Sequence, residues 1–330
     1  MNSKMIKQLL PTLSLLLLLA GCSGEQSVIE AELPVVPGDE RVPLSVQSAG
    51  IEAEVESSTR AGTPLTRGSI GIFLTGTGYT PLNNKQYNYG SSAWTPKDEG
   101  NTIYLGSLNA IVCAYYPYES TSVSVDGFTL TSQVYAADKE LFYATEQLVN
   151  GSKTGSPNRN VTFDLVRAYS WVKVIVKRHS INYPGTCAVT ALKLKNILGS
   201  TALDIHDGEQ GSNTSEVAND VSATTFSTTL PSGGDTMEKD FLMVPCAFTA
   251  TPVNGTSNCG LIIELTVDGR TMTTGIPTGT LHEMVRGKQY IIAVTINGTK
   301  LGVTEVNEAP GWDTSAPGID GGDALPVPNP

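Results

Sequence analysis

The chain has 330 residues and a formal net charge of −11; 40% of its residues are hydrophobic and 16% are charged. The negative charge argues against a nucleic-acid partner, because affinity for phosphates depends on a basic face that releases counterions. The apolar content excludes general disorder, and the length exceeds that of one typical core, so we expect two domains.

Residues 1–21 are expected to be a secretory signal and not part of the fold. Lys4 and Lys7 precede an apolar stretch that is too short to cross a bilayer core of about 30 Å. The stretch ends in Leu-Ala-Gly-Cys22, which resembles the lipobox of bacterial lipoproteins, whose cysteine is acylated. Each buried CH₂ of an acyl chain contributes roughly 0.8 kcal/mol, so lipid on Cys22 would tether the mature chain to a membrane.

The other cysteines give little sign of a covalent framework or a metal site. Cys113 lies in an apolar run and is expected to be a buried thiol. Cys246 and Cys259 could form a hairpin bridge, and whether they do so is left open. Because no CxxC pair occurs, a zinc site is not supported.

The segment after the signal predicts a tether followed by a first strand. Residues 23–41 are rich in Glu and Pro and lack periodicity, which is typical of a flexible linker. Apolar and polar residues then alternate over 42–55, which predicts a strand pair or one long strand with a bulge at Gly50. The apolar positions of this strand are Leu44, Val46, Ile51 and Val55. Residues 56–64 contain many turn formers and are expected to be an exposed loop.

From Ser69 onward the chain reads as short β-rich runs separated by turn signals, with one helix candidate at 138–149. Asp268-Gly269 predicts a hairpin. Strands at this spacing are typical of β-sandwiches, so we predict an all-β fold of two sandwiches with about seven strands each. The seam is placed at 180–186, which gives domains 61–185 and 186–312. Residues 313–330 form a Gly- and Pro-rich tail, because proline cannot donate to a strand ladder.

No pattern in the sequence predicts a catalytic, cofactor-binding or metal-binding site. The three histidines are His179, His206 and His282, and the zinc-protease spacing is absent after His282. His206 lies between Asp204 and Asp207, which we interpret as a solvated loop. No serine stands in a GxSxG elbow, and the aspartates of the tail lack calcium-loop spacing. The chain is therefore expected not to be an enzyme and to need no cofactor.

Several motifs occur in a characteristic order along the chain. They are the lipobox at Cys22, the first strand closed by Arg60-Ala61, the aromatic run 114–118, the run 163–167 leading into 172–176, the run 241–245, Gly287-Lys-Gln-Tyr290 and Gly311-Trp312. This order resembles the fimbrillin family, the surface pilin lipoproteins of Bacteroidales-type bacteria, and it implies two transthyretin-like β-sandwich domains in tandem with little helix. The chain departs from the family in carrying Arg167 where many relatives have His, and in its Pro-rich tail.

The resemblance implies processing and assembly by strand exchange. An arginine-specific protease would remove the lipidated propeptide 22–60 by cutting between Arg60 and Ala61, with Arg41 and Arg67 as competing sites. A strand from a neighbouring subunit would then fill the vacated groove. We prefer the segment 301–312 as the donor strand over the tail, because its backbone donors are intact until Pro310. Its anchors would be Leu301, Val303, Val306 and Trp312.

The predicted role is therefore that of a structural pilin subunit supporting adhesion. It would be exported as an outer membrane lipoprotein and then built into a cell surface fimbrium, with other fimbrial subunits as partners. One alternative is an anchor or tip subunit that keeps its lipid. Another is a stand-alone surface lipoprotein that binds glycan or host protein through loop aromatics; the candidates are Tyr79, Tyr87, Tyr89 and Trp94.

Overall fold

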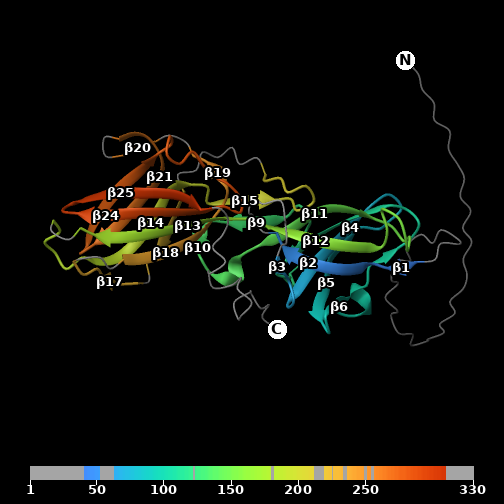
Figure 1. The fold of residues 1–330 in the computed structure, drawn as a ribbon. Helices are drawn as coiled ribbons and strands as arrows, with labels where there is room; N and C mark the ends of the chain where they lie inside the picture. The colour runs from blue at the N-terminus through green and yellow to red at the C-terminus, as the bar shows by residue number, and fades with distance from the viewer. Residues whose placement is uncertain are drawn as a thin grey trace, which may run out of the picture. The chain divides into compact units, whose positions relative to one another are not determined.

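The computed structural model describes residues 41–52, 63–121, 123–179, 182–211, 219–224, 226–232, 236–248, 251–253 and 256–309. These residues are organised almost entirely as β-strands, and the only helical turns among them are the 3-10 turns Glu99–Asn101 (η1) and Ala137–Lys139 (η2). In Figure 1 the colour of the strands runs from blue at the N-terminus to red at the C-terminus. The predicted all-β class is confirmed.

The first large sheet has eight strands in the order β3-β2-β12-β11-β8-β4-β5-β6. Alternation explains its strands: in β12, Val161, Phe163 and Leu165 are buried while the residues between them face outward. β1 (Val42–Pro43) pairs separately with β7 (Tyr104–Leu105). The bounds are Ser45–Ile51 for β2, Thr63–Pro64 for β3, Ser69–Thr75 for β4, Leu82–Gly90 for β5, Ala93–Pro96 for β6, Ala110–Tyr116 for β8, Phe142–Val149 for β11 and Asn160–Arg167 for β12.

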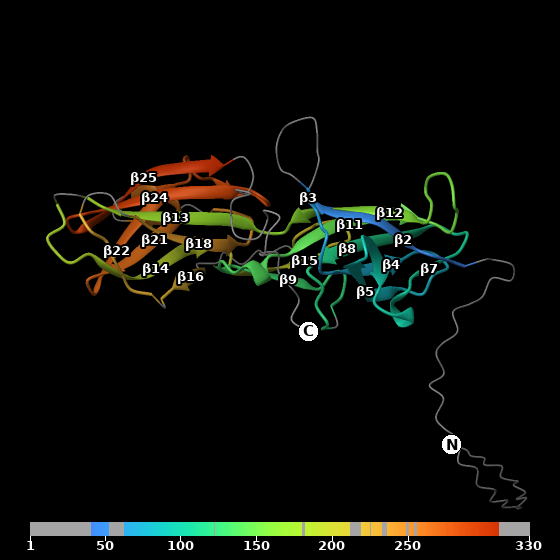
Figure 2. The ribbon, with the colours of Figure 1, turned by 60° about the horizontal axis from the view of Figure 1, so that its bottom comes forward.

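Two further sheets enclose a second core (Figure 2). One has the order β10-β18-β13-β24-β25, with bounds Gln133–Val134, Thr236–Met243, Ser170–Arg178, Gln289–Asn297 and Lys300–Ala309. The other has the order β16-β14-β21-β20, with β17 on β14 and β22 on β21. Its bounds are Asn219–Ala223, Ala188–Ile197, Thr256–Val267, Thr251–Val253, Thr228–Thr229 and Arg270–Pro277.

The eight-stranded sheet is covered on both faces. One face packs against β1 and the loops around Ile103, and the other packs under the small sheet of β9 (Phe128–Thr131) and β15 (Ser200–Leu203). This second cluster also contains Leu242 and Val244, from the end of β18 and just after it. Another two-stranded pair joins β19 (Cys246–Ala247) to β23 (Glu283–Met284).

The strand pairing divides the chain differently from the predicted seam. β13 pairs with β18 and β24 over its whole length, although the seam at 180–186 had assigned it to the first domain. Its valines at 172, 174 and 176 are buried among residues of the later strands. Conversely, β15 pairs with β9, so residues 200–203 pack with the earlier part of the chain although the seam had assigned them to the second domain. The change of sheet therefore falls between β12 and β13.

Two local predictions, the helix candidate and the position of the bulge, were wrong. The helix candidate at 138–149 is η2 followed by β11, which pairs with β8; one extra residue between Ala144 and Gln147 interrupts its alternation and imitates a helical pattern. The loop at His206 is partly exposed, with the His206 side chain 34% exposed, and the His206 carbonyl accepts from Glu146 N–H at 3.0 Å. The bulge in the first strand lies at Gln47 and not at Gly50, since Val46 faces Val161 and Ser48 faces Thr162.

The hairpin and one cysteine prediction are confirmed. Val267 pairs with Arg270, and Asp268 and Gly269 both have positive φ, as a two-residue hairpin turn of type I′ requires. Cys113 is a buried thiol whose pKa is raised to about 12, chiefly by burial. Cys246 is a free thiol, and the side chain of Cys259, its predicted bridge partner, lies outside the described residues. In the part of the chain that the structure describes, no helix is long and apolar enough to cross a membrane.

Candidate functional site

The segment Val42–Ile51, called the first-strand segment below, lies between strands on both of its edges. On one side β2 pairs in parallel with β12, so that Ile51 faces Leu165. On the other side β1 pairs with β7, and β2 pairs with β3, where Ile51 faces Thr63. Figure 2 shows the blue strand β2 between β3 and β12. The segment therefore occupies a slot with two walls and is not added to an open edge.

Backbone hydrogen bonds outside the ladders extend both walls. On the β12 side, Ser45 N–H donates to the Arg159 carbonyl at 2.9 Å, and Glu52 N–H donates to the Leu165 carbonyl at 2.8 Å. On the opposite side, Leu44 N–H donates to the Ile103 carbonyl at 2.8 Å, and Leu65 N–H donates to the Ala49 carbonyl at 2.9 Å. Removing the segment would leave these groups without their partners, so the slot is built to receive main chain on two edges.

Apolar side chains of the segment point into the core beneath it. The predicted residues Leu44, Val46 and Ile51 are 5%, 6% and 3% exposed. Sequence reasoning missed Ala49 as a core position, although it is 1% exposed. The sequence feature that could have revealed Ala49 is the three-residue step from Val46 to Ala49, which the bulge at Gln47 produces. These side chains belong to one buried cluster, which also contains Val161, Phe163, Leu165, Ile103, Leu105 and Trp94.

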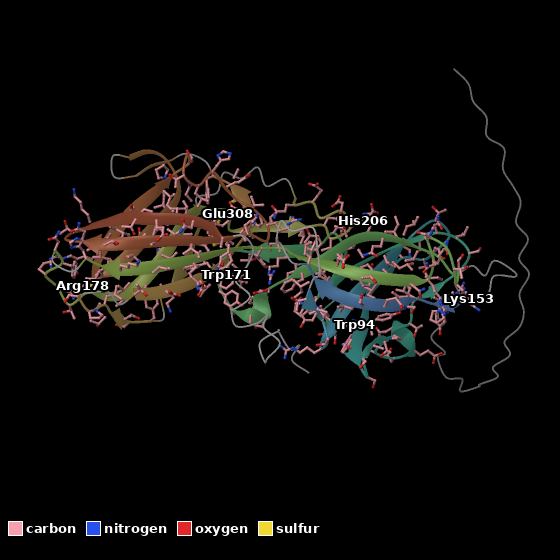
Figure 3. The ribbon with its side chains drawn as sticks, viewed as in Figure 1. Trp94, Lys153, Trp171, Arg178, His206 and Glu308 are labelled. Carbon is pink, nitrogen blue, oxygen red and sulfur yellow. The ribbon has the colours of Figure 1, made fainter. Side chains whose placement is uncertain are left out.

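Trp94 of β6 contributes to the buried cluster next to the first-strand segment. It is 5% exposed and packs edge-on against Tyr89, with ring centroids 5.4 Å apart and ring planes at 67°. Figure 3 labels Trp94 close to the first-strand segment, in agreement with the contacts between β2 and β6. Tyr87 hydroxyl accepts a hydrogen bond from Ile103 N–H at 3.2 Å, which fixes the strand position that receives Leu44.

The competing arginines lie in different surroundings. Arg41 is exposed just before β1, and a cut there would leave the first-strand segment attached. Arg67 is half-buried between β3 and β4, next to Gly68, which has a φ of +80° and lies against the Tyr116 ring. Burial raises the pKa of Tyr116 to about 12, and the Arg67 charge opposes this rise. Cys22, Val55, Arg60 and Ala61 lie outside the described residues.

The predicted donor strand lies in the chain's own sheet. Leu301, Val303 and Val306 belong to β25, the last strand of its sheet, which pairs antiparallel with β24. Leu301 is buried, whereas Val303 and Val306 are partly buried against the core. Thr304 is an extra residue between the pairs of Val303 and Glu305, so the apolar spacing matches that of Leu44, Val46 and Ala49. Trp312 lies outside the described residues.

A family model described as fimbrillin-like matches residues 59–310. The chain belongs to the fimbrillin-like family. Family membership supports a role as a fimbrial subunit at the cell surface, and it describes a structural type of protein with no known enzymatic activity. No curated protein matches the chain.

Two solved structures share this fimbrillin-like fold. A putative cell adhesion protein from Bacteroides uniformis is 17% identical with a TM-score of 0.53, over 82% of this chain and 99% of that one. A putative cell adhesion protein from Bacteroides ovatus is 16% identical with a TM-score of 0.53, over 83% of this chain and 99% of that one. At these identities the likeness supports the fold, and the chain spans nearly the full length of both proteins.

The aromatic residues proposed to bind ligands from loops are parts of the fimbrillin core. Tyr87 and Trp94 are buried, and Tyr79 and Tyr89 pack against the same cluster. The Tyr79 hydroxyl accepts from Gly106 N–H at 2.9 Å and donates to the Leu108 carbonyl at 2.8 Å. These rings hold loops in place and do not form a free platform, so they do not support the stand-alone adhesive alternative.

Proposed function

We propose that this fimbrillin-like protein is a pilin subunit that is exported as a lipoprotein on Cys22, cut after Arg60 and polymerised by strand exchange. The observation that carries the proposal is the two-walled slot that holds the first-strand segment. Outer membrane attachment would precede the cut, and the freed subunit would then join other subunits in a surface fimbrium. An arginine-specific protease is the partner in processing.

The cut would convert a held strand into one that can be replaced. While the loop is intact, the first-strand segment competes at a very high effective concentration and no neighbour can displace it. Once cut, burial of its larger apolar side chains contributes roughly 1.5–3 kcal/mol each. Ordering the backbone costs about 1–2 kcal/mol per residue over the same segment. The ordering cost offsets the gain from side-chain burial, so the peptide can leave the slot.

The two walls favour Arg60 as the cut over Arg67. A cut after Arg60 leaves Thr63, Pro64 and Leu65 on the remaining chain, and with them the wall opposite β12. A cut after Arg67 would remove β3 and Leu65, the part of that wall along β2, together with the strand. The family match begins at residue 59, which fits a boundary at this loop.

Arg60→Ala is expected to block processing and to leave a monomer about 4 kDa heavier, in proportion to the 34.9 kDa of the 330 residues. Gel mobility and N-terminal sequencing of surface material measure this, and Arg41→Ala is the matched control. Ala61 at the N-terminus identifies a processed pilin, whereas a blocked Cys22 identifies an anchor that keeps its lipid. Normal trimming and polymer formation by the Arg60→Ala variant would mean that the cut lies elsewhere.

For the donor strand we propose the segment Leu301–Trp312, whose spacing around Thr304 resembles that of the first-strand segment. Donation requires β25 to leave β24, and the slot would offer Val303 and Val306 pairing on both edges in place of one. Truncation after Gly318 is expected to leave polymer formation intact, as measured on gels of undenatured fimbriae. Loss of polymers in that truncation would assign the donor role to the tail 319–330.

A further inference from the structure

A cavity of about 720 Å³ lies next to the cluster that contains Phe128 and Tyr169, apart from the first-strand slot. It is open to solvent on one side and is lined by the loop after β8, by β9 and β10, by η2, and by Tyr169 in the turn between β12 and β13. Cavities of about 300–1,000 Å³ are typical of small-molecule sites, which occur preferentially where structural units meet. The strand-exchange proposal does not use this cavity.

One wall is a row of uncharged polar side chains. Phe128 and Leu130 of β9 point into the core, so the alternation of the strand turns Thr129 and Thr131 toward the cavity. Gln133 continues the same row at the start of β10. This wall offers two hydroxyl groups and a carboxamide, each of which can both donate and accept hydrogen bonds.

Three carboxylate residues also line the cavity. Glu119 lies in the loop after β8, and Asp138 and Glu140 lie in and just after η2. Glu140 is buried, and its carboxylate lies 3.9 Å from the Arg167 guanidinium. Asp138 lies 3.9 Å from Lys139, the one basic residue of the lining. The carboxylates are acceptors for hydroxyl groups, and their excess over Lys139 disfavours an anionic ligand.

The walls are held in place by buried hydrogen bonds. Tyr169 hydroxyl accepts from Thr131 N–H at 3.2 Å, which fixes β9 against the turn. Ser132 hydroxyl donates to the Leu198 carbonyl at 2.6 Å and accepts from Val244 N–H at 3.0 Å. Phe128 packs edge-on against Tyr115, with ring centroids 4.7 Å apart. A site whose walls are already fixed loses little conformational entropy when a ligand binds.

We propose that this cavity binds a neutral saccharide. Hydroxyl, carboxamide and carboxylate groups of the lining match the many hydroxyl groups of a sugar, and Pro117 and Leu141 supply an apolar surface for its C–H groups. The polar character of the lining disfavours a lipid chain, and the excess of carboxylates disfavours sialylated or sulfated sugars. The site would act in adhesion and does not require the chain to polymerise.

The test is binding of the purified full chain to an array of neutral oligosaccharides, with their sialylated and sulfated counterparts as matched controls. The best neutral sugar is then titrated by saturation-transfer NMR at millimolar concentration. Neutral sugars are expected to bind, and Thr129→Val/Thr131→Val is expected to weaken binding about tenfold, because it removes two hydroxyl groups while preserving shape. Thr95→Val, in the exposed part of β6, is the control substitution.

Several results would overturn the proposal. They are no binding of any neutral sugar at millimolar concentration, equal binding by the double valine variant, or equal binding of the anionic counterparts. Retention of a host glycoprotein after enzymatic removal of its glycans, with no sugar bound, would assign the cavity to a protein partner instead. Circular dichroism melting of each variant confirms that loss of binding is not loss of fold.

Discussion

Replacing Arg167 by methionine is expected to lower the free energy of unfolding by about 3–5 kcal/mol, because it leaves the Glu140 carboxylate buried without its cationic partner. Both side chains are only 7% exposed, and their charged atoms are 3.9 Å apart. Arg167 also lies over the Phe142 ring, with 5.3 Å between its guanidinium carbon and the ring centroid. Urea unfolding of the uncut protein measures the loss.

The double variant Glu140→Gln/Arg167→Met is the matched control, because it removes both charges while keeping similar volumes. It is expected to recover most of the lost stability, since the cost comes from the orphaned charge and not from the absence of the pair. If the double variant is as unstable as Arg167→Met, lost packing of the arginine on Phe142 is the cause.

The same pair predicts a pH dependence. Burial raises the pKa of Glu140, and the Arg167 charge opposes that rise. The folded state therefore binds the Glu140 proton more tightly than the unfolded state, in which the pKa is about 4.3. This contribution to stability is complete below the unfolded pKa and is lost as the pH rises through the folded value. The deficit of Arg167→Met should accordingly be smaller at pH 4 than at pH 7.

Ile51→Ala is expected to make the first-strand peptide leave the cut protein roughly 30- to several-thousand-fold faster. Loss of a buried isoleucine side chain costs about 2–5 kcal/mol, and the bound peptide loses all of it on this strand. Ile51 is 3% exposed and lies between β12 and β3. The measurement is cleavage by an arginine-specific protease, followed by gel filtration and mass spectrometry at successive times.

Gln47→Ala is the control within the same strand, because Gln47 is exposed at the bulge. It should release the peptide at nearly the unchanged rate. Equal release rates for the Ile51 and Gln47 variants would show that side-chain burial does not hold the strand, and the main-chain bonds of the slot would then have to account for its retention.

Alternation predicted the inward-facing residues of the first strand but not the strands that pair with it. Leu44, Val46 and Ile51 could be assigned to the core because each stands in a two-residue period. The sequence contains no local signal that β2 pairs in parallel with β12, because pairing across more than a hundred residues is decided by packing. The bulge at Gln47 was missed for a related reason: its effect becomes visible only when Val161 and Thr162 are known to be adjacent partners.

Two aromatic residues were expected in exposed loops but lie in the core. Tyr87 and Trp94 stand among polar residues, so the sequence suggested loops, yet β5 and β6 form a hairpin that turns both rings inward. The run 138–149 suggested a helix because the bulge before Gln147 lets two successive residues, Thr145 and Glu146, face solvent. In each case a turn or bulge changes which face a residue occupies, and the tertiary partner determines the outcome.

The parallel pairing of β2 with β12 also bears on the timing of folding. Ser48 and Thr162 lie in direct contact but are 114 positions apart in sequence. A contact so distant closes slowly, because the entropy of a long loop must be lost before the pairing stabilises it. During synthesis the first strand emerges early, while the strand that receives it emerges much later. The first strand therefore stays unpaired until β12 has been made and the long loop between them has closed, and during that time its pairing with β12 competes with contacts to other molecules.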